Sequence, residues 1–209
     1  MLGTIVVLSG PSRAGKSTIA ARIQDALDGI WMHIGMDLHI QSTPPRYKPG
    51  VGLRPVRPED VRDVDGRVSY DDLVDAVPAL YASLYGSAAV HARHGLNVVM
   101  DVYHHDNYPK PLDTLGIAKR ELGGLPSLFV GVNAPLDVIW DRRGQTWGQH
   151  RDSVGDDVRS AVEMHDAAAR ALRYDIRLDT SELSPEECVD RIARRLAEGP
   201  GTILSNPRT

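Results

Sequence analysis

Cysteine is almost absent from this 209-residue sequence, in which Cys188 is the only one. A single cysteine cannot form a disulfide within the chain, so the fold must depend on a hydrophobic core. The length and a content of 42% hydrophobic residues are sufficient for one. We therefore expect a globular protein of a reducing compartment, the cytoplasm, with Cys188 packed as a small side chain in a terminal helix.

Long basic and long apolar runs are missing as well. Lysine and arginine are scattered and the net charge is −4, so a surface for nucleic-acid backbones is not expected. No stretch approaches the roughly 18 apolar residues of a membrane-spanning helix, and the apolar start at residues 1–10 has no basic leader. The sequence predicts neither a nucleic-acid nor a membrane partner, and it leaves a homo-oligomer open.

Short apolar runs are what the sequence has instead. They lie at residues 4–8, 96–101, 127–132 and 175–178, with a weaker one at 31–35. They do not alternate strictly with polar residues, which is typical of strands covered on both faces. Segments with helical spacing follow the runs, at residues 16–27, 71–94, 111–122, 135–143 and 184–198. This alternation predicts an α/β fold of three layers, in which helices cover both faces of a mostly parallel five-stranded sheet.

Two polar stretches interrupt this pattern. Residues 42–65 are dense in proline, arginine and glycine, and the segment VRDVDGRVSY is typical of a small hairpin that turns at Asp65 and Gly66. Residues 142–157 are polar around Trp147. Both are either plain surface loops or a mobile substrate flap, about 42–70, and a lid, about 142–157. We expect one domain over residues 1–198 and a flexible tail over 199–209.

A glycine-rich segment links the first apolar run to the first helix. It matches the pattern GxxxxGK[ST] and consists of Gly10, Pro11, Ser12, Arg13, Ala14, Gly15, Lys16, Ser17 and Thr18. In this setting its backbone N–H groups converge and the helix dipole adds positive potential, which suits a polyphosphate. Lys16 can charge-pair with the β- and γ-phosphates, and the Ser17 hydroxyl suits Mg²⁺. The segment predicts a P-loop that binds ATP.

Two aspartates end apolar runs on the expected carboxyl edge of the sheet. Asp101 ends NVVMD and is a candidate to support Mg²⁺, although a helix cap or loop aspartate would fit the sequence too. Asp37 follows residues 31–35 and could accept the proton of an attacking hydroxyl. Its alternative is the cap of a short helix at residues 38–42.

Histidines flank both aspartates, and arginines gather in the expected lid. The spacing of His33, His39, His104 and His105 matches none of the usual zinc patterns, so solvated or hydrogen-bonding histidines are favoured over a metal cluster. The arginines of the lid are Arg142, Arg143 and Arg151. Arg142 and Arg151 are candidates to close on the transferring phosphoryl group and Arg143 to contact the nucleotide, and an ion-paired helix end is the competing interpretation.

The chain resembles the chloramphenicol phosphotransferase-like family of P-loop kinases. The matching segments are VVLSGPSRAGKST, the GMD with Asp37, NVVMD with Asp101, LFVGVNAPLDV and YDIRLDTSELSPEEC, which together span about residues 4–195. The resemblance implies Mg²⁺-assisted phosphorylation of a hydroxyl by ATP, with Asp37 as general base and Lys16 and Ser17 on the nucleotide. It also implies that Thr180 borders the adenine, for which a helix-entry turn is the alternative.

The acceptor stays open at this point. A small hydroxylated molecule, chloramphenicol or a related antibiotic, is the leading hypothesis. Kinases of a metabolic sugar, nucleotide or nucleotide sugar are a second one. A nucleotide-dependent switch without a small acceptor is the third, and the candidate base Asp37 disfavours it.

Overall fold

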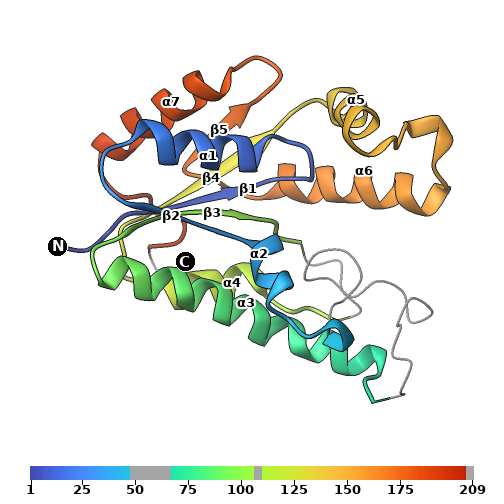
Figure 1. Ribbon diagram of the computed structural model, residues 1–209, viewed down its shortest axis with the longest axis horizontal. Coiled ribbons are helices and arrows are strands. Elements are labelled where there is room, and N and C mark those ends of the chain that lie inside the picture. The colour runs from blue at the N-terminus through green and yellow to red at the C-terminus, as the bar shows by residue number, and fades with distance from the viewer. Residues whose placement is uncertain (48–66, 106–109, 206–209) are drawn as a thin grey trace.

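A five-stranded parallel sheet forms the centre of the protein in the computed structural model, which describes residues 1–47, 67–105 and 110–205 (Figure 1). The strand order is β2-β3-β1-β4-β5. The strands are β1 (Ile5–Ser9), β2 (Trp31–Gly35), β3 (Asn97–Val102), β4 (Ser127–Asn133) and β5 (Ile176–Asp179). The predicted sheet is confirmed, including the weakly indicated β2.

The strands are apolar on both faces because both faces are covered. In β1, Ile5 and Val7 belong to one hydrophobic cluster, and Val6 and Leu8 belong to the other. All four are fully buried. This explains why β1 reads as a continuous apolar run without alternation.

Helices form the two outer layers. Figure 1 shows α1 (Lys16–Ala26) and α7 (Pro185–Ala197) on one face of the sheet, and α3 (Tyr70–Arg93) and α4 (Thr114–Leu122) on the other. The predicted three-layer α/β fold is therefore confirmed. The side chain of Ser184 accepts a hydrogen bond from the Glu187 amide at the start of α7, as its sequence indicates.

Helix α3 is the longest element, with 24 residues. By length and composition alone it could cross a membrane, since its mean hydropathy is 1.3, so the expectation that no stretch approaches this limit was too strict. Its apolar side faces the core, where Val77, Tyr81 and Leu84 are buried. A core helix of a soluble protein has the same character.

The first polar stretch is described only in part. After β2 the chain forms α2 (Met36–Gln41) and a 3-10 turn at Pro45–Tyr47. The expected hairpin turn at Asp65 and Gly66, and most of the expected flap, lie outside the described residues.

The second polar stretch is more helical than its sequence indicates. Helix α5 (Leu136–Trp147) extends beyond the expected end at residue 143, a 3-10 turn follows at Arg151–Ser153, and α6 (Asp156–Ala171) was not expected. Of the residues of α6, only Val162, Asp166 and Ala169 are buried. Since Val162 and Ala169 are the only apolar residues among these three, the sequence of α6 shows little of the apolar stripe that predicts a helix.

The expectation of a flexible tail from residue 199 is wrong for residues 201–205. Leu204 is 1% exposed within the core cluster of α3 and α4. The Gly201 amide donates to the Ser127 carbonyl at 2.7 Å, and the Thr202 amide donates to Asp175 Oδ1 at 2.7 Å. Residues 201–205 are thus bound at the amino-terminal edge of the sheet.

Candidate active site

The glycine-rich segment forms the turn between β1 and α1. Gly15 takes the left-handed conformation, with φ of 95°, immediately before α1 begins at Lys16. A Cβ atom at Gly10 would lie 1.9 Å from the Val132 carbonyl oxygen, so only glycine permits this approach to β4. The first amides of α1 therefore open toward the carboxyl edge of the sheet, where a helix amino terminus favours an anion.

Lys16 is held against the backbone of this loop. Its Nζ donates to the carbonyls of Gly10 at 2.8 Å and Pro11 at 2.9 Å. Burial lowers the pKa of Lys16 to about 8, the charges of Asp101 and Asp37 act in the opposite direction, and Arg13 lowers it further. Lys16 is thus a buried cation whose desolvation the neighbouring carboxylates only partly offset, a setting that favours an anionic ligand.

Asp101 lies within β3. The alternative interpretations of Asp101, as a helix cap or as a loop aspartate, are therefore wrong. Its Oδ2 accepts a hydrogen bond of 2.6 Å from the Ser17 hydroxyl, and its Oδ1 lies 3.3 Å from His33 Nε2. A Cβ atom at Gly35 would lie 2.1 Å from Asp101 Oδ1, so the glycine provides the space for this carboxylate. Parallel pairing of β2 with β3 sets Gly35 beside Asp101.

The charge of Asp101 is stabilised by these neighbours. Burial raises the pKa of Asp101, but the contacts with His33 and Ser17 and the positive charge of Lys16 outweigh it and leave the pKa below its usual value. The same contact raises the pKa of His33. A hydroxyl and an ionised carboxylate in contact are hard oxygen donors, so this pair fits the ligand preference of Mg²⁺.

The histidines hold neighbouring elements together, which agrees with the hydrogen-bonding interpretation. His39 Nε2 lies 2.8 Å from the Ser83 hydroxyl of α3, and His104 Nε2 lies 2.5 Å from the Tyr85 hydroxyl. Among the described residues, no group of three or more histidine, cysteine, aspartate or glutamate side chains could hold a metal ion. The partnership of His33 with Asp101 was missed, because it depends on strand pairing across the sheet.

Asp37 lies in the first turn of α2, directly after β2. The cap of this helix is Gly35, so the alternative in which Asp37 is the cap is wrong. Its side chain is exposed, and its charge acts on Lys16. The sheet thus brings Asp37, Lys16 and Asp101 to one edge, with Asp37 accessible to a substrate.

Arg142 connects the P-loop with the loop after β5. Its guanidinium donates to the Thr180 hydroxyl at 2.8 Å, to the Thr180 carbonyl at 2.8 Å and to the Arg13 carbonyl at 3.2 Å. The Thr180 hydroxyl also donates to the Ala14 carbonyl at 2.9 Å. Thr180 and Arg142 therefore lie beside the P-loop backbone, where they can contact a nucleotide.

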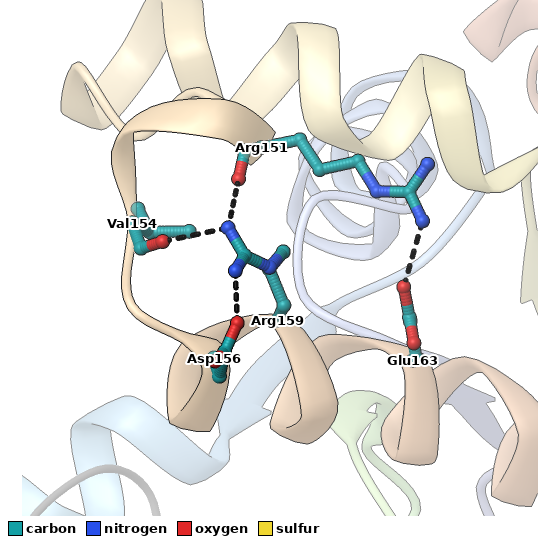
Figure 2. Close-up of polar contacts among 5 residues, drawn as sticks. All are labelled: Arg151, Val154, Asp156, Arg159 and Glu163. Atoms are coloured by element: carbon teal, nitrogen blue, oxygen red, sulfur yellow. Dashed lines mark hydrogen bonds and ion pairs between the residues drawn. The ribbon is translucent and has the colours of Figure 1, made fainter.

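Arg151 and Arg159 define the turn between α5 and α6. Figure 2 shows Arg151 extended toward Glu163 of α6, with a nitrogen–oxygen distance of 3.0 Å. Arg159 bridges the turn by donating to the carbonyls of Arg151 and Val154 and to the Asp156 carboxylate (Figure 2). In this arrangement Arg151 has the ion-paired role that its sequence left open. Arg143 is buried instead, and its guanidinium lies 4.9 Å from the Trp147 ring centroid.

A cavity of about 370 Å³ lies between the end of β3, the start of α4 and α6. It is lined by His104, His105, Thr114, Leu115, Met164, Ala167, Ala168, Ala171 and Leu172. Burial, followed by the charge of His105, lowers the pKa of His104 to about 3, so His104 is neutral. Sequence reasoning missed this cavity because α6 supplies much of its lining.

The family comparison agrees with these motifs. A family model described as chloramphenicol phosphotransferase-like protein matches residues 3–197. Two Mycobacterium tuberculosis proteins, from strains CDC 1551 and H37Rv, are named as candidate O-phosphotransferases and are 34% identical over 106 residues. That match covers 47% of this chain and 45% of each relative, so the chain spans less than half the length of these relatives.

Solved structures share the fold at low sequence identity. The APS kinase of Mycobacterium tuberculosis, in complex with AMPPNP and APS, has a TM-score of 0.61 at 16% identity, covering 94% of this chain and 98% of that one. A sugar kinase from Janibacter sp. has a TM-score of 0.58 at 18% identity, covering 94% and 95%. These likenesses show the architecture of P-loop kinases.

Proposed function

Because the chain belongs to the chloramphenicol phosphotransferase-like family, we propose that it is a cytoplasmic kinase that transfers the γ-phosphoryl group of ATP to a hydroxyl of a small molecule. The observation that carries the proposal is the convergence of Lys16, the Ser17–Asp101 pair and Asp37 on one edge of the sheet. Phosphoryl transfer depends mainly on such positioning and on charge neutralisation.

Each of these residues has a defined part in the proposed reaction. The acceptor oxygen bonds to the γ-phosphorus, the bond from that phosphorus to the bridging oxygen breaks, and ADP leaves. The exposed Asp37 carboxylate accepts the proton of the hydroxyl. Lys16 and the amides at the start of α1 hold the β- and γ-phosphates. Of the lid arginines, Arg142 stands beside the P-loop, and Arg151 would have to leave Glu163 to act.

Ser17 and Asp101 are the residues that would hold Mg²⁺. The bound ion would neutralise part of the phosphate charge. Asp101 is suited to this because its neighbours keep it ionised, and His33 fixes the orientation of its carboxylate.

We assign the acceptor to the cavity lined by His104, Thr114 and α6. Of the described residues that line it, none is a lysine, arginine, aspartate or glutamate, and His104 is neutral, which leaves His105 as the one lining side chain that can carry a charge. Such a lining favours an uncharged, partly apolar molecule with a hydroxyl, and a volume of about 370 Å³ suits one of drug-like size. Chloramphenicol and related antibiotics are acceptors of this kind.

The test is a screen for phosphorylated products by mass spectrometry, with ATP, Mg²⁺ and a set of acceptors that includes chloramphenicol, sugars, nucleotides and nucleotide sugars. We expect a product from an uncharged, partly apolar compound with a hydroxyl, such as chloramphenicol, and none with Lys16→Ala. Transfer only to a sugar or a nucleotide would support the proposed kinase activity but would refute the acceptor assignment. Acceptor-independent ATP hydrolysis with no product would refute the kinase.

Asp37→Asn tests the proposed base. The change removes the proton acceptor and keeps the size of the side chain, so we expect turnover to fall by roughly 10²- to 10⁴-fold. The Kd for ATP should stay the same, because the proposed role of Asp37 is toward the acceptor. Single-turnover transfer and calorimetric ATP binding measure the two effects. Full transfer activity in Asp37→Asn would refute the assignment.

A further inference from the structure

Arg13 has the least common backbone conformation in the P-loop. Its φ is 67°, in the left-handed region that glycine adopts freely and other residues adopt rarely. Its carbonyl accepts a hydrogen bond from Arg142. A large cationic side chain is thus held at a position where glycine would be more easily accommodated.

The guanidinium of Arg13 lies over an indole ring. Its central carbon is 3.7 Å from the ring centroid of Trp147, the last residue of α5. Arg143 lies 4.9 Å from the same ring. Stacking occupies the face of a guanidinium and leaves its N–H groups, which lie in the plane, free to donate to a ligand.

Those donors have no acceptor among the described residues. The Nε of Arg13 is buried and makes no hydrogen bond, and Arg13 takes part in none of the ion pairs within the described part of the chain. Buried N–H groups in proteins are nearly always paired, so an unpaired one beside a phosphate-binding turn indicates an anionic ligand. The charge of Arg13 also lowers the pKa of Lys16, so the two cations lie near each other.

We propose that Arg13 is a positioning residue for the polyphosphate of ATP and that Trp147 holds its guanidinium in place. The inference rests on the proposed nucleotide site and adds to it a side chain that the P-loop pattern does not specify. The end of α5 is thereby connected to the phosphates through one stacked pair.

The test compares ATP binding by the full chain and by variants, in the presence of Mg²⁺, using titration calorimetry. Arg13→Gly should weaken ATP binding about 10- to 100-fold, the range expected for a lost charge-assisted hydrogen bond. Its melting temperature should stay close to that of the wild type, because the ease with which glycine adopts φ of 67° offsets the lost contact with Trp147. Binding of adenosine, which has no phosphate, should not change. Arg13→Lys should lie between the wild type and Arg13→Gly, since it keeps the charge and loses the planar stack.

The variant Trp147→Leu tests whether Trp147 holds the guanidinium of Arg13 in place. It should weaken ATP binding less than Arg13→Gly does. We expect ATP to change the fluorescence of the wild-type protein through Trp147, which is 47% exposed, and Trp147→Leu should remove most of that change because Trp31 and Trp140 are only 8% and 4% exposed. Arg194→Ala, in the last turn of α7, is the control for loss of one positive charge.

Three results would overturn the inference: unchanged ATP affinity in Arg13→Gly, an equal loss of adenosine and ATP affinity, or a loss that parallels a lower melting temperature. Failure of the wild-type chain to bind ATP is a different outcome, because it would refute the proposed function and this inference together.

Discussion

Lys16 shows how a single side chain can be prepared for a ligand by what surrounds it. Its Nζ is bound to two backbone carbonyls, and its pKa of about 8 lies below the ordinary value of 10.5 because burial disfavours the charge. The motif GxxxxGK[ST] was sufficient to propose roles for Lys16 and Ser17. It could not predict that His33 would contact Asp101, or that Arg13 would stack on Trp147, since these contacts join distant parts of the sequence.

The lowered pKa of Lys16 should make the proposed binding of ATP depend on pH. Bound phosphates favour the charged lysine and so raise its pKa, which means that binding takes up a proton wherever the free protein has lost it. We expect uptake close to zero at pH 7 and approaching one proton at pH 9, with affinity falling as pH rises above about 8. Calorimetry in two buffers with different ionisation enthalpies measures the uptake. Lys16→Arg stays charged and should show none, and equal uptake in both proteins would assign the proton to another group.

Gly35→Ala should disturb Asp101 without altering Asp101 itself. The new Cβ would lie 2.1 Å from Asp101 Oδ1, so the carboxylate must leave its contacts with Ser17 and His33. We expect the Mg²⁺ concentration for half-maximal transfer to rise on the order of tenfold or more, as for other losses of support behind a metal ligand. Gly86→Ala on α3 is the matched control, because its Cβ would find the nearest atom at 3.6 Å. The same Mg²⁺ dependence in both variants would contradict the role given to Asp101.

The elements differ in how clearly their sequences predict them. Strands β1, β3 and β4 and helix α3 are strongly apolar, and their predicted positions, like those of the less apolar β2 and β5, agree with the structure to within one or two residues. Helix α6 was missed because most of its surface is polar, and α5 continues four residues past its expected end. The short apolar stripe of α6 becomes part of a core only when α5 packs on it. Trp140 and Val162 then belong to one small cluster.

The turn between α5 and α6 should open locally when its arginine bridge is removed. Arg159 donates to the carbonyls of Arg151 and Val154, so Arg159→Leu leaves both without that partner. We expect amide exchange within residues 149–155 to accelerate about tenfold, which corresponds to about 1.4 kcal/mol of local stability, with little change in melting temperature. Arg173→Leu, an exposed position just after α6, is the control. Unchanged exchange in the turn would show that the packing of α5 on α6 holds it without Arg159.

At the scale of the whole molecule, the parallel sheet explains why the candidate site could be predicted in outline. All five strands run in the same direction, so residues that follow β1, β2 and β3 must meet at one edge. The cavity assigned to the acceptor needs α6 and the start of α4 as well, and the order of segments alone does not bring them together. The proposed phosphate end of the site is therefore indicated by local sequence motifs, whereas the proposed acceptor end depends on the tertiary fold.

The last described residues bind at the amino-terminal edge of the sheet, opposite the candidate site. These residues should therefore contribute to the stability of the protein. Leu204 is 1% exposed among the side chains that α3 and α4 bury, and Gly201 and Thr202 hold the segment on the sheet. Leu204→Ala should lower the free energy of unfolding in urea by about 2 to 5 kcal/mol, the usual cost of such a cavity.

Leu2→Ala is the matched control for this change, because Leu2 is 48% exposed and its truncation should cost little. ATP affinity measured at a temperature where both variants are folded should stay that of the wild type, since Leu204 packs far from the carboxyl edge that carries Lys16 and Asp101. If Leu204→Ala unfolded no more easily than Leu2→Ala, the end of the chain would contribute nothing to the core. A loss of ATP affinity in the folded variant would instead mean that the two edges of the sheet are coupled.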